Sequence, residues 1–169
     1  MNTVAMTVAG AVLSVVIFIL NVRSWWKGNR ELKALMPFGG GLITGAGWTM
    51  CVGGIFGWVA TQAVEASNKI GDKAVSTTTG AKGGGGLAHG SLGSLTYPGA
   101  CAVLVAALIG AVVLKAAGKA DTKRMLGGLF TGLTLCATAG FAQGMQWVPD
   151  LYNWLGNSAV SIFDGKVSL

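Results

Sequence analysis

Few residues in this sequence are of the types that carry catalysis. The one histidine, His89, lies in a Gly- and Ser-rich stretch, and Cys51, Cys101 and Cys136 each lie inside an apolar run. A Ser–His–Asp triad, a metalloprotease helix or a zinc cluster needs more His, Cys or carboxylate partners than this. We therefore expect no catalytic residue, no metal site and no cofactor, and we interpret the cysteines as small packing residues.

The run Gly83 to Gly86 raises the question of a phosphate-binding loop. No Lys-Ser/Thr pair follows it, and it opens no predicted helix, so the phosphate-binding pattern is not met. We interpret this run as a flexible spacer and His89 as an incidental loop residue.

Polar side chains inside the apolar runs are threonines and glutamines. Each Thr can return its hydroxyl to its own helix backbone. Gln143 and Gln146 either behave as ordinary helix residues, or bond to a neighbouring helix, or line a wet seam. The apolar runs hold no Asp, Glu, Lys, Arg or His, which argues against an ion-coupled transporter but not against a passive pore. The polar residues are Thr44, Thr49, Thr131, Thr134, Thr138, Gln62, Gln143 and Gln146.

Composition places these residues in a membrane protein. The 169 residues are 52% hydrophobic and 11% charged, whereas soluble domains carry about 25% charged residues. The net charge of +6 comes without a dense Lys/Arg run or an aromatic-rich soluble domain, so we expect no sequence-specific nucleic-acid binding. The fold class we predict is an all-α integral membrane protein with membrane lipid as its surroundings.

Four apolar runs predict four transmembrane helices in two tandem hairpins. The predicted division is hairpin 1 over 1–65, a Gly/Ser/Thr-rich extracytoplasmic loop over 66–98, hairpin 2 over 99–148, and an interfacial tail over 149–169. The spans are expected at about 4–22, 38–64, 100–117 and 126–148. In the tail, apolar residues recur at helical spacing, and Gly156-Asn157 is expected to break that helix.

Basic residues set the predicted orientation. They cluster after the first and third spans, while the long loop holds three and the tail one. The positive-inside rule then places both short turns in the cytoplasm and both termini outside the bacterial cytoplasmic membrane. The basic turns comprise Arg23, Lys27, Arg30, Lys33, Lys115, Lys119, Lys123 and Arg124.

A sequence pattern recurs in the second and fourth spans. GGLxTG begins at Gly40 and again at Gly127, an offset of 87, and each copy carries two small-xxx-small pairs. This spacing favours close helix packing in membranes, and the repeat predicts two equivalent, parallel hairpins. The first spans compare more loosely, at an offset of 91. The predicted helix-packing residues are Gly41, Gly45, Gly53, Gly57, Gly128, Gly132, Gly140 and Gly144.

A span, a short basic turn and a second span that opens with Gly-Gly resemble the pilin subunits of conjugative type IV secretion systems. That resemblance implies hairpins with both ends outside, assembly into a hollow filament, and basic turns that face its lumen. The chain departs from the pattern because it has two hairpins, a long Gly-rich loop and no evident leader. It is also similar to small hydrophobic proteins of plasmids and phages of high-GC Gram-positive bacteria, including plasmid-spread proteins and holins.

These observations favour a non-enzymatic, self-associating subunit of a membrane assembly for conjugative transfer, as a pilin-like or a channel component. The expected partners are further copies of the chain and other transfer or phage proteins. After assembly the location is either the membrane or an extracellular filament. Two alternatives stay open: a phage-type holin that forms a lysis pore, and an accessory subunit that packs against a larger membrane protein.

Overall fold

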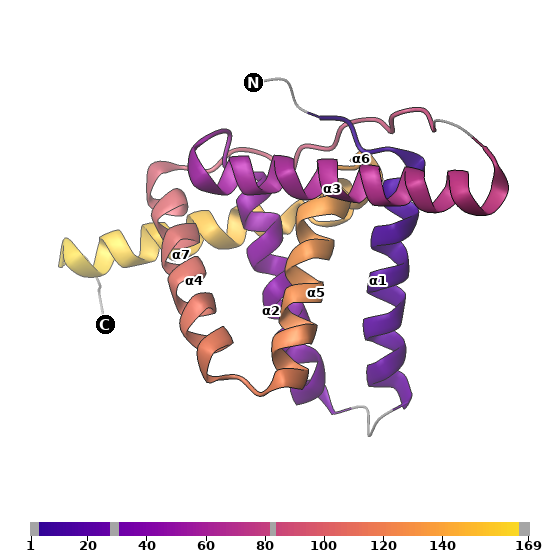
Figure 1. Cartoon of the computed structure of the whole chain (residues 1–169). Coiled ribbons are helices and arrows are strands. Elements are labelled where there is room, and N and C mark those ends of the chain that lie inside the picture. The colour runs from indigo at the N-terminus through magenta and orange to yellow at the C-terminus, as the bar shows by residue number, and fades with distance from the viewer. Residues whose placement is uncertain (1–3, 28–30, 82–83, 166–169) are drawn as a thin grey trace.

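The computed structural model describes residues 4–27, 31–81 and 84–165. Within them the chain is all-α, without a β-strand, as the composition predicts. In chain order (Figure 1) the helices are α1 Val8–Lys27, α2 Leu32–Thr49, α3 Gly54–Thr79, α4 Tyr97–Ala116, α5 Lys119–Leu135, α6 Ala139–Gly144 and α7 Trp147–Phe163.

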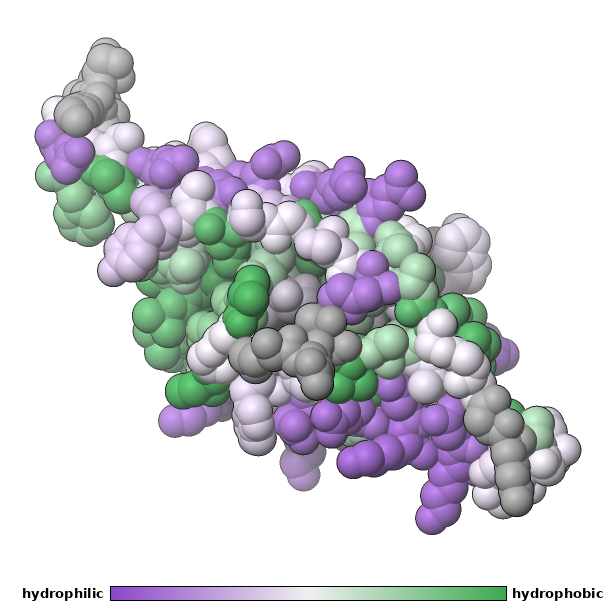
Figure 2. All heavy atoms as spheres, turned by 90° about the horizontal axis from the view of Figure 1, so that it is seen from above, coloured by the Kyte–Doolittle hydropathy of each residue, from purple (hydrophilic) through white to green (hydrophobic). Residues whose placement is uncertain are grey.

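Four helices run side by side, and two lie across one end of them. Figure 1 shows α1, α2, α4 and α5 upright, with α3 and α7 roughly perpendicular to them at the upper end. The axes of α2 and α3 differ by 108°. Viewed from above in Figure 2, hydrophilic side chains gather along the two long margins of this end, with hydrophobic side chains between them. We call this the crossing end, and the opposite end the basic end.

Two of the described helices, α1 and α4, are long and apolar enough to cross a membrane. If the bent pair α2–α3 is counted as one broken span, the number of candidate membrane spans among the described helices rises to three. Helix α5 is shorter, with 17 residues, and its first turns carry charged residues. At the start of α4, the Thr96 hydroxyl accepts from the backbone N–H of Gly99, and Pro98 needs no such partner.

The second predicted span is wrong in its length. Helix α2 ends at Thr49, and the chain turns at Gly54, whose φ of +67° favours glycine. Helix α3 then runs to Thr79 and ends at Gly80, with φ +73°. The loop predicted from residue 66 therefore begins only at residue 80.

The fourth predicted span is likewise too long, because α5 ends at Leu135. Backbone groups just beyond it pair with the linker between α3 and α4: Gly90 N–H donates to Ala137 O at 2.8 Å, and Ala139 N–H donates to Ala88 O at 3.0 Å. This pairing draws the chain out of the helix. The short α6 follows.

The predicted helical tail is present as α7, but it begins at Trp147 and continues through Gly156 and Asn157 without a break. Pro149 lies in its first turn. A proline ring clashes with the carbonyl four residues earlier, and for Pro149 this is the carbonyl of Met145, in the break between α6 and α7.

The predicted hairpins are not packed pairs. Helix α1 packs mainly against α3 and α5, and α4 mainly against α7 and α2, whereas the most extensive helix contact joins α2 to α5. The larger buried cluster lies where the crossing helices meet α2, α4 and α5, and it includes Ala46, Val103, Val148 and Tyr152.

Candidate functional site: a glycine seam and two helix crossings

The contact between α2 and α5 is built on glycine. A Cβ on Gly41 would overlap the carbonyl oxygen of Met125 and lie 2.9 Å from the amide N of Leu129. A Cβ on Gly45 would overlap the carbonyl of Leu129 and lie 3.0 Å from the amide N of Leu133. Backbone therefore meets backbone along α2, and no side chain larger than hydrogen fits at either position.

The partner helix is built in the same way. A Cβ on Gly128 would overlap the carbonyl of Phe38 and lie 3.0 Å from the amide N of Leu42. One on Gly132 would overlap the carbonyl of Leu42 and lie 3.0 Å from the amide N of Ala46. We call this α2–α5 contact the glycine seam.

The seam is reciprocal. Each of its four glycines meets the carbonyl three residues before the matching glycine of the other helix, at the same offset of 87. The contacts advance in the same direction along both helices, so α2 and α5 are parallel. Such a match is the arrangement of a two-fold interface, and here it occurs within one chain.

The other predicted packing glycines are not in the seam. A Cβ on Gly53, Gly140 or Gly144 would meet nothing within 4 Å. Gly57 packs closely, but against the carbonyl of Cys51 at the α2–α3 turn. Four of the eight predicted packing glycines thus lie in the seam, and the contact they make lies inside the chain.

Helices α1 and α3 cross at a second close contact. A Cβ on Gly10 would lie 3.1 Å from the Cα of Asn68, and one on Gly71 would lie 2.6 Å from the amide N of Gly10. The Asn68 amide fastens this contact: Oδ1 accepts from Thr7 N at 2.8 Å, and Nδ2 donates to Ala5 O at 2.9 Å. We call this contact the first crossing.

Helices α4 and α7 form a second crossing with the same parts. A Cβ on Gly99 would lie 3.2 Å from the Cα of Asn153, and one on Gly156 would lie 2.6 Å from the amide N of Gly99. The Asn153 Oδ1 accepts from Thr96 N at 2.9 Å, and its Nδ2 donates to Ser94 O at 3.4 Å.

Sequence reasoning missed these crossings, although a signal for them exists. Thr-x-x-Gly occurs at Thr7 and Thr96, an offset of 89, and Asn-x-x-Gly at Asn68 and Asn153, an offset of 85. The offset of 91 for the first helices is therefore wrong by two residues. In each copy the Thr hydroxyl accepts from the glycine N–H, at 3.1 and 3.2 Å.

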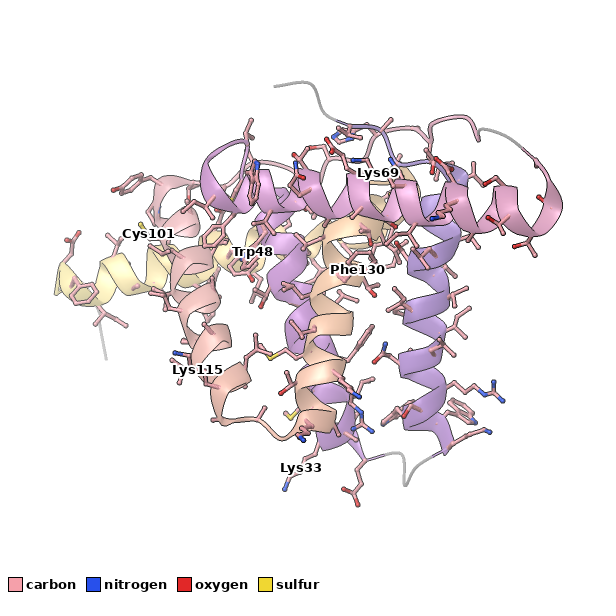
Figure 3. All side chains as sticks on the ribbon, viewed as in Figure 1. Lys33, Trp48, Lys69, Cys101, Lys115 and Phe130 are labelled. Carbon is pink, nitrogen blue, oxygen red and sulfur yellow. The ribbon has the colours of Figure 1, made fainter. Side chains whose placement is uncertain are left out.

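The basic turns meet at the basic end of the bundle. Figure 3 shows Lys33 and Lys115 there, and Lys69 at the crossing end. The stretches 23–33 and 115–124 hold eight basic and two acidic residues, while the rest of the chain holds four of each. The whole net charge thus belongs to the two turns. The described basic residues at this end are Arg23, Lys27, Lys33, Lys115, Lys119, Lys123 and Arg124, and Arg30 lies outside the described residues.

Two side chains at the basic end tie neighbouring helices together. The Arg124 guanidinium donates to the carbonyl of Ala34 at 3.2 Å, which joins α5 to α2. The Trp25 indole donates to the carbonyl of Glu31 at 3.0 Å, which joins α1 to the start of α2.

The threonine prediction is confirmed at Thr44, Thr49, Thr131, Thr134 and Thr138, whose hydroxyls all donate to carbonyls of the same helix or turn. Gln143 and Gln146 are exposed near the start of α7.

The linker is more than a spacer where the structure describes it. Leu87 N–H donates to Met6 O at 2.7 Å, and isolated bridges join Gly86 to Thr7 and His89 to Thr138. The linker therefore fastens the segment before α1 to the end of α5. Gly83 lies outside the described residues.

A cavity of about 220 Å³ lies under this linker, at the crossing end of the seam. Cys51, His89 and Cys136 all line it. Burial raises the pKa of the Cys136 thiol to about 12 and also raises that of Cys51, so both stay protonated and act as packing groups. Cys101, in contrast, is exposed on α4. In the described part of the chain, no three His, Cys, Asp or Glu side chains come together as metal ligands.

No family model, curated protein or solved structure matches the chain.

Proposed function

We propose that the chain is a multi-pass protein of the bacterial cytoplasmic membrane in which α1, α2, α4 and α5 cross the bilayer. These helices have 17 to 20 residues, about 25–30 Å at 1.5 Å per residue, close to the thickness of the hydrocarbon layer. Large apolar side chains are exposed along the outer helices: Val12, Val16, Ile19 and Leu20 on α1, and Leu104, Leu108, Ile109 and Val112 on α4.

In this placement the basic end faces the cytoplasm, and both termini lie outside. The positive-inside rule supports it, because the basic end carries all the net charge. Helices α3 and α7 would then lie along the outer surface. Exposed Trp154, Ile162 and Phe163 on α7 suit the boundary between lipid and water. Impermeant thiol labelling tests this: a Cys at Ser91 should label in intact cells, and one at Ser24 should not.

The internal repeat we propose has three helices per copy. Helices α1, α2 and α3 correspond to α4, α5 and the pair α6–α7, at offsets of 89, 87 and 85. The reciprocal seam and the two matched crossings support this correspondence. The copies interlock, since the first helix of each packs on the second helix of the other.

The role we propose is a non-enzymatic, membrane-resident channel component for conjugative transfer that works as an assembly of several copies. The glycine seam carries this proposal. Two helices in backbone contact leave no room for a path between them, so a macromolecule would have to pass between copies or beside a partner. The glycines are used within the chain, so copies would associate through their lipid-facing sides.

The filament alternative has less support. A pilin-like hairpin needs its two helices paired with each other, whereas α1 packs on α3 and α5. Removing the α3 and α5 contacts to make a free hairpin would expose the backbone of Gly10 and Asn68.

The experiment is a deletion of the coding sequence in a host that transfers DNA by conjugation. A channel component predicts a large loss of transfer with unchanged growth. Normal transfer frequency would overturn the proposal. A holin would instead collapse the membrane potential when expressed alone, and an accessory subunit would be degraded without its partner.

A further inference from the structure

A groove of about 190 Å³ lies beside the first crossing, where α3 projects beyond α1 (Figure 1). Its walls are Val8, Ala9 and Val12 of α1, Asp72 and Val75 of α3, and Ala81 and Gly84 of the linker. Val8 and Val12 are about half exposed, at 49% and 54%. The groove thus continues the apolar outer face of α1 up to the underside of α3.

Among the described residues of these walls, Asp72 is the one that carries a charge. Its Oδ1 accepts a hydrogen bond from the Thr7 hydroxyl at 3.2 Å. The ion pairs among the described residues join Lys69 to Glu65 and Arg124 to Asp121, so Asp72 is in neither. A carboxylate has about four acceptor sites for hydrogen bonds. A carboxylate that lies beside an apolar wall is stabilised by a nearby cation or by further hydrogen-bond donors.

The second crossing lacks this carboxylate. At the offset of 85 the position of Asp72 is taken by Asn157, which is neutral and exposed. The matched crossings therefore differ in charge at this point, although their Asn–Thr contacts agree. The Asp72 carboxylate is therefore not one of the parts that the two crossings share, and its acceptor sites other than the one that Thr7 uses can serve a ligand.

We propose that the groove binds a phospholipid whose headgroup carries an ammonium group, such as phosphatidylethanolamine. The ammonium lies at Asp72, and the start of an acyl chain lies along Val8, Val12 and Val75. The inference rests on the proposed membrane placement, which puts α3 at the outer surface and the α1 face in the acyl region. The charge of Asp72 determines which headgroup binds. Its carboxylate attracts a headgroup that carries an ammonium group and repels an anionic headgroup that has no cationic group.

The test is thermal unfolding of the purified full chain in mild detergent, with phosphatidylethanolamine or phosphatidylglycerol added at equal concentration. A ligand that binds the folded state raises the unfolding temperature. We expect phosphatidylethanolamine to raise it more than phosphatidylglycerol in the parent. Asp72→Asn keeps an acceptor for Thr7, and it should reduce the phosphatidylethanolamine shift to the phosphatidylglycerol value. Val75→Trp should fill the groove and reduce the same shift.

The matched control is Asp150→Asn, which removes an exposed carboxylate from the first turn of α7 at the same end of the molecule. It should keep the parent's lipid preference. Equal shifts for both lipids in the parent, or an unchanged preference in Asp72→Asn, would overturn the proposal. Alkaline extraction of membranes distinguishes a failure of the lipid-binding proposal from a failure of the proposed membrane placement. A chain that stays in the membrane without a lipid preference disproves the groove alone, whereas a chain that is extracted disproves the placement.

Discussion

The two crossings reach the same backbone contact with different side chains around it. In the first, Ser14 and Ser67 are fully buried, and both hydroxyls are within hydrogen-bond distance of Gly10 O, at 3.1 and 2.9 Å. In the second, the matching positions hold Val103 and Tyr152. Glycine and the Asn–Thr contact are common to both, so these parts make the crossing, and the surrounding residues adapt to each site.

Tyr152 shows what the second crossing gains from the difference. Its ring packs on Gly47, and its hydroxyl donates to Ile43 O at 3.2 Å, which fastens α7 to α2. Burial raises the pKa of Tyr152 to about 12, so the hydroxyl stays a donor at physiological pH. The first crossing has Ser67 there, and that hydroxyl bonds to Gly10 and Ser14 of α1.

The largest effect should come from blocking the crossings themselves. Gly71→Leu and Gly156→Leu each place a side chain on backbone of the facing helix, and relief requires the helices to separate. We expect each to lower the free energy of unfolding by about 3 kcal/mol, measured by thermal unfolding in mild detergent. Gly144→Leu, which meets open space, is the control. If only one of the two substitutions lowered the free energy of unfolding, the two crossings would not be equivalent.

A smaller effect should separate the two asparagines. Asn68 is buried and Asn153 is half-buried, so water can replace the lost partner more easily at the second crossing. We expect Asn68→Ala to cost about 2 kcal/mol and Asn153→Ala about 1 kcal/mol. Hydrogen exchange at the amides of Thr7 and Thr96 checks the cause, because each substitution should speed exchange at its own threonine. If Asn68→Ala and Asn153→Ala lowered the free energy of unfolding equally, the difference in burial of the two asparagines would not determine the cost.

The smallest effect tests the adaptable residues. Ser14→Val installs the residue found at the matching position of the second crossing, with a similar shape. Ser67 keeps its own bond to Gly10 O, so the change in unfolding free energy should stay below about 1 kcal/mol. A loss as large as that of Asn68→Ala would show that the serine pair, and not the Asn–Thr contact, holds the first crossing.

The sequence predicts the helices that carry long apolar runs and misses the helix whose buried positions are polar or small. The apolar runs locate α1 and α4, and the helical spacing of the tail locates α7. The part of α3 beyond residue 66 is predicted as loop, because its buried positions there are Ser67, Asn68 and Gly71. They recur at helical spacing, but polar and small residues give no hydrophobic period.

The ends of α2 and α5 were missed for a related reason. The apolar runs continue past both ends, so hydropathy alone predicts longer spans. Helix α2 ends at a glycine turn, and α5 ends where its following residues pair with the linker. The pairing beyond α5 joins residues 47 and 51 positions apart, Gly90 with Ala137 and Ala88 with Ala139, and no local pattern contains both partners.

The glycine motif indicates which stretches of the chain pack closely, but not which helix each stretch contacts. GGLxTG indicates a close helix contact without saying which helix is across it. The match between Gly41 and Gly128 within one chain follows from the parallel placement of α2 and α5, which depends on the whole fold.

The most direct test of the account is to block the seam from each side and ask what fails. Gly45→Leu and Gly132→Leu are compared with Gly140→Leu, by light scattering for particle mass and by thermal unfolding, all in the same mild detergent. If the seam holds the two halves of one chain together, both seam variants lose the cooperative unfolding of the parent, while Gly140→Leu keeps it. If both seam variants unfold like the parent and differ only in particle mass, these glycines act between copies, and the account is wrong.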